Sequence, residues 1–253
     1  MSRSTHCRHG RVFTLPLLLA LLLGACAQPH VAAKTETAEA AGEGQQFLPS
    51  EAQFEQLFPQ RLPFYSYAGF VAAARSFSGF AAQGPAELRR QEMAAFLANI
   101  AHESDSLKAV REYNQANYDH YCSLAEGRSC APGQQYYGRG PIQLSWNYQY
   151  LAAGQALGED LWAEPDRVAR EPKLAWQTAI WYWMSQPGPA SVPAHQAMVA
   201  GAGFGASIRA INGALECDQA ADSAAARQIA RRIDFYRRAA ALFNVPPGPR
   251  LGC

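Results

Sequence analysis

The sequence predicts a mainly α-helical domain, and three observations support that fold class. Apolar residues recur at spacings of three and four in several segments, which is the period of a helix with one buried face. Alternation of apolar and polar residues rarely persists beyond four residues, so strand signals are weak. The chain has 253 residues, 49% of them hydrophobic, which is enough for one domain with a large core and room for two lobes.

The first 25 residues have the charge and apolarity of a secretory signal. A positive start, made by Arg3, Arg8 and Arg11, precedes an apolar run at 15–23 that is too short to span a bilayer. Residues 23–26, Leu-Gly-Ala-Cys, resemble a bacterial lipobox, in which the cysteine is lipidated and becomes the new N-terminus. We expect a lipoprotein signal peptide over 1–25 and a lipid anchor on Cys26. The alternative is an ordinary signal peptide cleaved near Ala25 or Ala27.

The segment that follows has the composition of a linker. Residues 26–45 are rich in Ala, Glu and Thr and contain no aromatic residue, so they predict a flexible tether ahead of a folded domain at 46–253. Ala27 is not the aspartate that retains many lipoproteins in the inner membrane. We therefore expect export and, in a source with two membranes, anchoring to the outer membrane.

The charge balance argues against several classes of partner. Removal of residues 1–25 lowers the count of Lys and Arg from 22 to 19, against 21 Asp and Glu, which leaves a formal charge of −2. This balance offers no basic surface for nucleic acid and no polybasic patch for a membrane. We expect membrane contact through the lipid alone, and a monomer.

The first strong helix signal lies around residues 93–100. Met93, Phe96, Leu97 and Ile100 mark one buried face, and Gly84-Pro85 supplies a start. Glu103 prolongs that face, so its carboxyl group is desolvated and its proton affinity rises, as a general acid requires. The alternative is a buried structural carboxylate paired with an arginine.

Two further helices are predicted in the second half of the chain. Residues 172–185 are apolar all round, which predicts a buried helix whose tryptophans belong to the core and do not form a sugar platform. A 4-3-4-3 spacing near the C-terminus predicts an amphipathic helix on Ile229, Ile233, Tyr236, Ala240 and Phe243. Arg232 flanks that stripe, while Arg231, Arg237 and Arg238 can point to solvent.

The segment 133–150 interrupts the helical pattern. Gly138, Gly140 and Pro141 predict a loop that brings the backbone close to another group. Gln143 and Ser145, two residues apart, would point the same way if the chain were extended there. Taken alone, the segment is a turn followed by a short strand.

Three motifs together resemble the glycoside hydrolases of family 19, the chitinases of plants and of some bacteria. They are His102-Glu103-Ser104, the run Val-Arg-Glu-Tyr-Asn-Gln-Ala-Asn-Tyr at 110–118 and Tyr-Gly-Arg-Gly-Pro-Ile-Gln-Leu-Ser at 137–145. The likeness extends over roughly residues 54–253. It implies a bilobal, lysozyme-like helical domain with a central substrate cleft. It also implies inverting endo-hydrolysis of β-1,4-linked N-acetylglucosamine polymers, namely chitin or chito-oligosaccharides.

The resemblance assigns a role to each matching residue. Glu103 is the general acid, Glu112 is the base that activates water on the opposite face of the sugar, and Ser145 helps to hold that water. The residues implied to contact or support the substrate are His102, Gln143, Tyr148 and Asn212. Glu216 and Arg232 match a charged network beside the acid. Without the resemblance, Asn212 in Ile211-Asn212-Gly213 would be read as a helix C-terminal cap.

The chain departs from the family pattern at two places beside the cleft. Ser104-Asp105-Ser106 stands where the family usually has threonine and then glycines, and Gln149 stands where related enzymes often have asparagine. These differences affect the expected subsite preference more than the reaction type.

The cysteines predict disulfides rather than a metal site. Four cysteines in an exported domain allow three pairings, and both the local spacing and the resemblance favour Cys122–Cys130 with Cys217–Cys253. The spacing lacks the order of a zinc site, and His120 and His195 are not expected to bind metal. No cofactor is implied, because carboxylates and water suffice for hydrolysis.

Two other functions compete with a chitinase. Peptidoglycan contains β-1,4-linked N-acetylglucosamine, so a lipoprotein of the bacterial envelope could be a peptidoglycan-degrading cell-wall hydrolase. A non-catalytic sugar-binding lipoprotein could use the same cleft. An inactive relative is expected to have lost one carboxylate, however, and this chain retains both Glu103 and Glu112.

Overall fold

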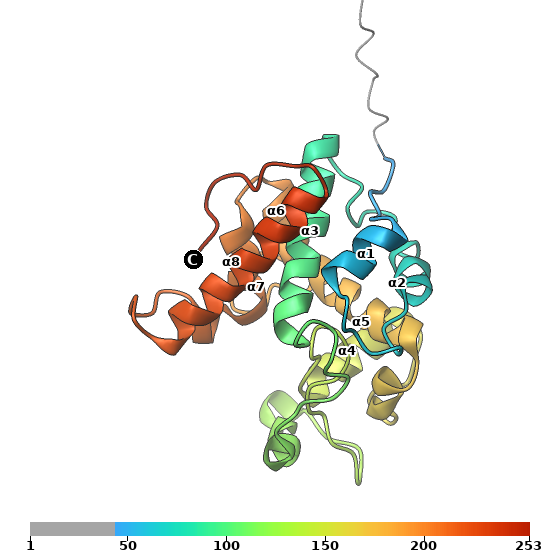
Figure 1. Ribbon diagram of the computed structural model, residues 1–253. Helices are drawn as coiled ribbons and strands as arrows, with labels where there is room; N and C mark the ends of the chain where they lie inside the picture. The colour runs from blue at the N-terminus through green and yellow to red at the C-terminus, as the bar shows by residue number, and fades with distance from the viewer. Residues whose placement is uncertain (1–43) are drawn as a thin grey trace, which may run out of the picture. The chain divides into compact units, whose positions relative to one another are not determined.

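A computed structural model describes residues 44–253 of the chain (Figure 1). The predicted signal peptide, Cys26 and the tether as far as residue 43 lie outside the described residues. From residue 44 onward the chain is built of helices, and two isolated β-bridges are the only ladder pairings. The predicted mainly α-helical fold is therefore confirmed. None of the helices in this part of the chain has both the length and the apolarity needed to cross a membrane.

Eight α-helices and three short 3-10 helices follow one another in the described part of the chain. In order they are α1 (Glu51–Leu57), α2 (Tyr67–Ala74), α3 (Ala86–Glu103), η1 (Gln115–Tyr121), η2 (Ala125–Gly127), α4 (Asn147–Leu157), η3 (Pro165–Ala169), α5 (Pro172–Ser185), α6 (Ala194–Val199), α7 (Phe204–Glu216) and α8 (Ala224–Leu242).

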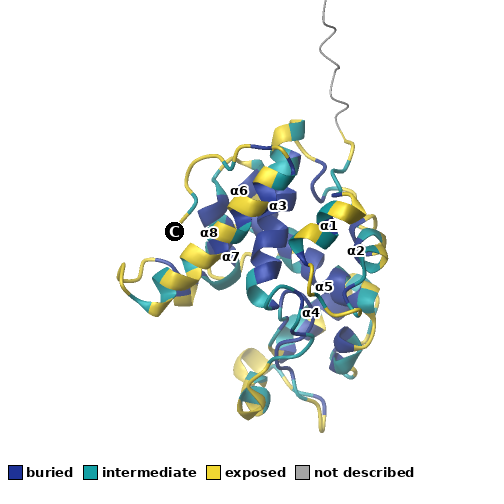
Figure 2. Cartoon of the chain, viewed as in Figure 1, coloured by how far each residue is buried: buried dark blue, intermediate teal, exposed yellow. Residues whose placement is uncertain are grey.

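Helix α3 is the central element of the fold. It begins after the predicted Pro85 and ends at Glu103. Burial extends over every residue from 92 to 101, because α8 packs along one side of the helix and α6 and α7 pack on others (Figure 2). A long buried helix is a rigid support. Glu103, its last residue, is thereby placed where the buried helix meets the surface.

Helix α5 forms the aromatic core together with the N-terminal helices. Trp176 and Trp183 are fully buried. The ring of Trp176 lies 5.0–6.4 Å from the rings of Phe54, Tyr65, Phe70 and Phe96. Such aromatic pairs contribute roughly 0.5–1.5 kcal/mol each beyond the area that they bury. The prediction that these tryptophans pack in the core is confirmed.

Helix α8 packs along α3 and carries the predicted apolar stripe. Ser223 caps its start, since the Ser223 hydroxyl accepts a hydrogen bond from the Ala226 amide at 3.1 Å. Tyr236 and Ala240 are fully buried, as the spacing predicted. Arg232 is fully buried as well. The sequence placed this arginine only beside the stripe, and its burial follows from partners on α3 and α7.

The two disulfides match the predicted pairing. Cys122–Cys130 closes a local loop, with a sequence separation of 8 residues. Cys217–Cys253 joins the residue after α7 to the C-terminal residue of the chain, 36 positions further on.

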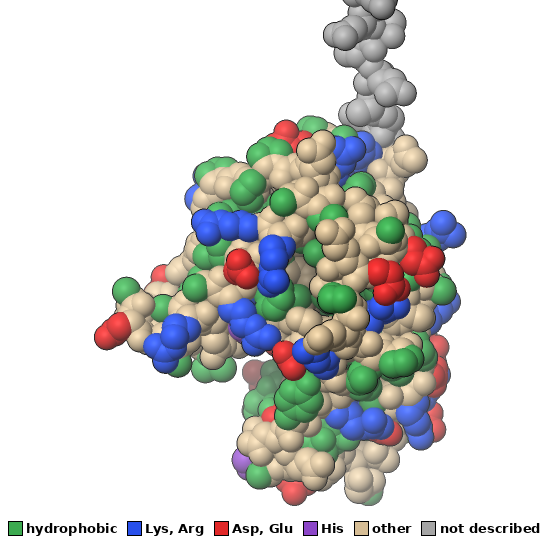
Figure 3. Space-filling view, in the orientation of Figure 1, with side chains coloured by type: hydrophobic (Ala, Val, Ile, Leu, Met, Phe, Trp, Pro, Cys, Tyr) green, Lys and Arg blue, Asp and Glu red, His purple; other side chains and the backbone are tan. Residues whose placement is uncertain are grey.

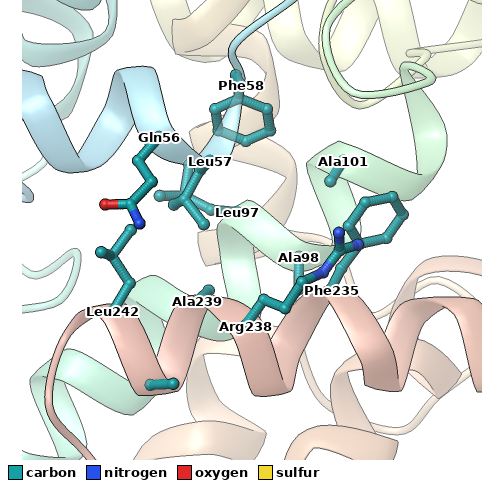
Figure 4. A pocket seen from close by; sticks show the side chains of 11 residues that line it. Gln56, Leu57, Phe58, Leu97, Ala98, Ala101, Phe235, Arg238, Ala239 and Leu242 are labelled. Carbon is teal, nitrogen blue, oxygen red and sulfur yellow. The ribbon is translucent and has the colours of Figure 1, made fainter.

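The described surface has hollows that differ in character. Figure 3 shows a notch between the outer end of the α7–α8 pair and the part that holds η1 and η2, next to the C-terminal end of α3. A separate apolar groove of about 480 Å³ lies between α1, α3 and α8 (Figure 4). Ala101 lines this groove, and it lies about 200° around the helix from Glu103, so the groove is on another face of α3.

Candidate active site

The part of the site that holds Glu103 is a cluster around Arg232. Its guanidinium donates to Glu103 Oε1 at 2.5 Å, to Asn99 Oδ1 at 3.0 Å and to both oxygens of Glu216 at 2.6 and 2.8 Å. The Arg232 side chain is fully buried, whereas Glu103 keeps 19% of its side chain exposed. The alternative reading of Glu103, a carboxylate paired with an arginine, is thus present in the structure. The partial exposure is what keeps this carboxyl group accessible to a ligand.

Glu216 is held as the second carboxylate of the same arginine. Asn212 Nδ2 donates to Glu216 Oε1 at 2.7 Å. Burial raises the pKa of Glu216, but the hydrogen bonds and charge of Arg232 outweigh burial and hold the pKa below its usual range. Asn212 does not cap the end of α7, because the helix continues to Glu216 with a kink at Asn212, where φ is −141°.

His102 lies beside this cluster and is neutral near pH 7. Burial, reinforced by the charge of Arg232, lowers the pKa of His102 to about 4. Its buried Nδ1 atom has no hydrogen-bond partner. An imidazole in this state can offer a neutral polar contact to a sugar but no positive charge.

Tyr182 of α5 is a residue of this region that the sequence did not reveal. Burial first, and then the neighbouring Glu103 and Tyr148, raise the pKa of the Tyr182 hydroxyl to about 12. The hydroxyl therefore lies near both Glu103 and Tyr148, a predicted sugar contact. The apolar pattern of residues 172–185 concealed it, because that pattern indicates only a buried helix.

Glu112 is held by hydrogen bonds from two segments. Asn117 Nδ2 donates to Glu112 Oε1 at 2.8 Å, and the Gly138 amide approaches Glu112 Oε2 at 3.4 Å. The Glu112 amide donates to the Gly138 carbonyl at 2.8 Å. Tyr121 also faces this carboxylate, and its pKa is raised to about 12 by burial and by Glu112. Amide groups and a hydroxyl thus orient Glu112 without an ion pair to its carboxylate.

The glycines of the 137–145 segment have the predicted role of close approach. A Cβ on Gly138 would lie 2.9 Å from the Gln143 side-chain oxygen, and Gly140 has φ +73°, a conformation that favours glycine. The residues after Gly140 form a turn, and Gln143 itself has φ +53°. The extended chain that would make Gln143 and Ser145 point the same way is therefore not present at Gln143. The Ser145 hydroxyl donates to the Gln143 carbonyl at 2.9 Å.

An aromatic surface adjoins this segment. The Tyr148 ring stacks near Trp146 at a centroid distance of 6.1 Å, and the Arg128 guanidinium lies 4.5 Å from its centre. Trp146 is 37% exposed, although the sequence motif gave no separate role to it. The side-chain oxygen of Gln149, the position that departs from the family pattern, is buried and has no partner. The exposed aromatic face suits the ring of a sugar.

The predicted residues therefore fall into two groups. Arg232 is hydrogen-bonded to both Glu103 and Glu216, and Asn212 is hydrogen-bonded to Glu216. Gly138 is hydrogen-bonded to Glu112, and the Gln143 side chain lies beside Gly138. Between residues 44 and 253 no hydrogen bond joins the carboxylates of Glu103 and Glu112. Nor does this part of the chain hold a group of three or more His, Cys, Asp or Glu residues placed to bind a metal ion. His195 instead contacts the buried Glu92 at 2.6 Å.

A comparison with known protein families assigns the chain. The family described as class I chitinase, glycoside hydrolase family 19, matches residues 55–253. This match covers well over half of the chain and both groups of site residues. The chain belongs to glycoside hydrolase family 19.

Individual relatives agree with the family. Chitinase 5 of rice, Oryza sativa subsp. japonica, is 42% identical over 191 residues, which is 75% of this chain and 62% of the rice protein. The chain thus spans less than two thirds of that relative's length. The crystal structure of chitinase C from Streptomyces griseus is 47% identical with a TM-score of 0.76, covering 81% of this chain and 96% of that one.

A further solved structure, titled as a bacterial family 19 chitinase, is 50% identical with a TM-score of 0.76. It covers 81% of this chain and 98% of its own. Together these structures confirm the lysozyme-like helical fold class that the resemblance implied.

Proposed function

We propose that this protein is an endo-acting, inverting chitinase, with Glu103 as general acid and Glu112 as general base. The observation that carries the proposal is the different support of the two carboxylates. Arg232 and a buried helix end hold Glu103, whereas amide groups on a separate segment hold Glu112. Environments that differ in this way are how one site provides both an acid and a base. The names of the relatives, chitinase and endochitinase, support the substrate class.

The acid cluster is suited to a proton that is given up and regained. It contains one cation, Arg232, and two carboxylates, of which Glu216 is held ionised. Because Glu216 already balances the cation, Glu103 can hold a proton without leaving a charge uncompensated. Once that proton passes to the glycosidic oxygen, the carboxylate that forms is hydrogen-bonded by Arg232.

The base side is suited to hold a water molecule. In an inverting reaction the two carboxyl groups lie about 6.5–9.5 Å apart, which leaves room for the attacking water. Glu112 accepts a proton from that water, while the oxygen of Ser145 is available to accept a second hydrogen bond from it. The bond to the leaving sugar breaks as the water attacks from the opposite face.

The sugar contacts follow from the neutral and aromatic groups of the cleft. Neutral His102, Gln143, Tyr148 and Asn212 provide polar contacts, and the exposed face of Trp146 provides an apolar one. We infer that these residues bind N-acetylglucosamine units on either side of the cleaved bond. No charged group is needed for this substrate, since chitin is uncharged.

The proposal is tested with the purified domain on chito-oligosaccharides and on peptidoglycan. Glu103→Gln and Glu112→Gln should each reduce kcat by about 10²–10⁴-fold, because each removes one proton-transfer group. Glu103→Gln should still bind oligosaccharide in calorimetry. Undiminished turnover in either variant would rule out its assigned role. Faster hydrolysis of peptidoglycan than of chitin oligomers would favour a cell-wall hydrolase, and binding without turnover in the wild type would favour a sugar-binding protein.

We further propose that the protein is exported and anchored to the bacterial envelope, at the outer membrane in a source with two membranes, by a lipid on Cys26. The support is the sequence pattern of residues 1–26. Cys26→Ala should move the protein from the membrane fraction to the soluble fraction. A wild-type protein found wholly soluble after export would contradict the anchor.

A further inference from the structure

Asp166 lies outside every motif that the sequence revealed, yet it joins two arginines beside the base. Arg111 Nη2 donates to both oxygens of Asp166, at 2.8 and 2.9 Å. Arg139 Nε donates to Asp166 Oδ1 at 3.3 Å, and Arg170 approaches Oδ2 at 3.9 Å. A two-point arginine–carboxylate pair fixes geometry as well as charge. Asp166 therefore holds Arg111 and Arg139 in one arrangement.

The carboxylate itself stands on a rigid part of the molecule. Asp166 belongs to η3, which packs against α5, and its neighbour Val168 is fully buried. Glu112, in contrast, lies in a segment with no helix of its own. A group on a loop is positioned precisely only when contacts tie it to the scaffold. Asp166 provides such a tie.

Arg139 connects that tie to the residues around the base. It is almost fully buried, and its guanidinium lies 3.6 Å from the centre of the Tyr137 ring. The Tyr118 ring lies parallel to Tyr137 at 3.5 Å between centroids. The Arg139 guanidinium and the Tyr118 ring cannot share one face of Tyr137, so the Tyr137 ring lies between them. Tyr118 in turn donates from its hydroxyl to the Glu112 carbonyl at 3.0 Å.

The backbone makes a second connection. Arg111 and Arg139 face each other in an antiparallel β-bridge. The residues that follow Arg111 and precede Arg139 are Glu112 and Gly138, whose amide and carbonyl are hydrogen-bonded at 2.8 Å. Asp166 thus binds the side chains of the two bridge residues, and the base is the next residue along the bridge.

We propose that Asp166 is a positioning residue for Glu112: it fixes Arg111 and Arg139 so that the bridge and the tyrosine stack hold the base in place. This inference depends on the proposed function, in which Glu112 is the base. As a positioning residue, Asp166 does not contact the substrate. It acts on the reaction through the placement of Glu112.

The negative charge of Asp166 also contributes to this arrangement. The charged or titratable side chains of the bridge and of the tyrosine stack are Arg111, Arg139, Tyr118 and Tyr137, while Tyr121 faces the Glu112 carboxylate. Asp166 compensates the two arginines. Without it, the guanidinium groups of Arg111 and Arg139 are left as neighbouring like charges with no shared partner, which loosens the arrangement that holds Glu112.

The experiment compares Asp166→Asn with the matched control Glu55→Gln. Glu55 also forms a two-point pair with an arginine, Arg61, on the surface of α1 away from the site. Asp166→Asn should lower kcat by roughly tenfold or more with little change in KM, since a small displacement of a catalytic group is costly. Asp166→Glu should restore most of kcat, and Glu55→Gln should behave as wild type.

Three results would overturn the inference. One is a kcat for Asp166→Asn equal to that of wild type, and another is an equal loss in Glu55→Gln. The third is a loss of kcat that Asp166→Glu does not restore, which would mean that the carboxylate does not act by fixing the two arginines. If Asp166→Asn does not fold, Arg111→Lys, which keeps the charge and loses the two-point geometry, should show the same fall in kcat. The proposed function is tested separately, because activity retained in Glu112→Gln contradicts the base itself.

Discussion

At the scale of single residues, the turn directly after Glu103 is built from residues that do not favour its backbone. Asp105, Ser106 and Leu107 have φ values of 49°, 58° and 65°. For residues other than glycine this conformation costs roughly 1–2 kcal/mol each. Hydrogen bonds offset the cost, since the Ser106 amide donates to the Ala101 carbonyl at 2.7 Å and the Leu107 amide to Ser104 Oγ at 2.9 Å. The turn that follows the acid is therefore well defined despite its lack of glycine.

A substitution at Ser106 tests this view of the turn. Ser106→Gly should raise the free energy of unfolding by about 1 kcal/mol, since glycine adopts positive φ without a steric penalty. Thermal denaturation should show a rise in Tm of about 2–4 °C. Ser106→Ala is the control and should give no gain, because alanine has the same penalty as serine. Equal effects of the two substitutions would contradict the explanation.

His102 should make the stability of the protein depend on pH. Its pKa is about 4 in the folded protein, below the ordinary value of 6.5. Between those values the unfolded state binds the extra proton, so the contribution is complete above about pH 6.5 and is lost as the pH falls toward 4. Urea unfolding from pH 7 to pH 4 should show a smaller loss of stability in His102→Gln than in the wild type. Parallel curves for the two proteins would contradict this assignment.

At the scale of elements, Arg232 connects three helices. From α8 it binds Asn99 and Glu103 on α3 and Glu216 on α7. The Arg232 side chain therefore joins the three helices and also supports Glu103. Its removal leaves two carboxylates close together without a cation.

The neighbouring arginine provides a matched comparison. Arg232→Ala should lower the free energy of unfolding by roughly 3–5 kcal/mol, the usual range for breaking a buried ion pair. Arg231→Ala should cost no more than about 1 kcal/mol, because its ion pair with Asp105, at 3.2 Å, is exposed to solvent. Chemical denaturation measures both variants. Similar losses in the two would mean that the buried cluster contributes little to stability.

At the scale of the whole molecule, the sequence predicted what depends on local periodicity. The helix at 172–185, the apolar stripe of α8 and the start of α3 at Pro85 were all predicted because helical spacing is local. The disulfide pairing was predicted from spacing and family resemblance.

The features of the fold and the site that the sequence did not predict depend on tertiary contacts. Arg232 is buried only because acids on α3 and α7 surround it, and Tyr182 approaches Glu103 only through the packing of α5. Asp166 meets Arg111 and Arg139 across 55 and 27 positions of sequence, so no local pattern signals it. The sequence predicted a turn in this segment but not the positive φ of Gln143, because glutamine does not favour that conformation.

In the proposed mechanism, an acid and a base act on opposite faces of one sugar. Proton NMR of the products during the first minutes of chito-oligosaccharide hydrolysis tests it most directly. A single displacement inverts the β-linkage, so the account predicts that the α-anomer appears first and then equilibrates with the β-anomer. Initial release of the β-anomer would contradict the account, because retention of configuration requires Glu103 and Glu112 to take other roles.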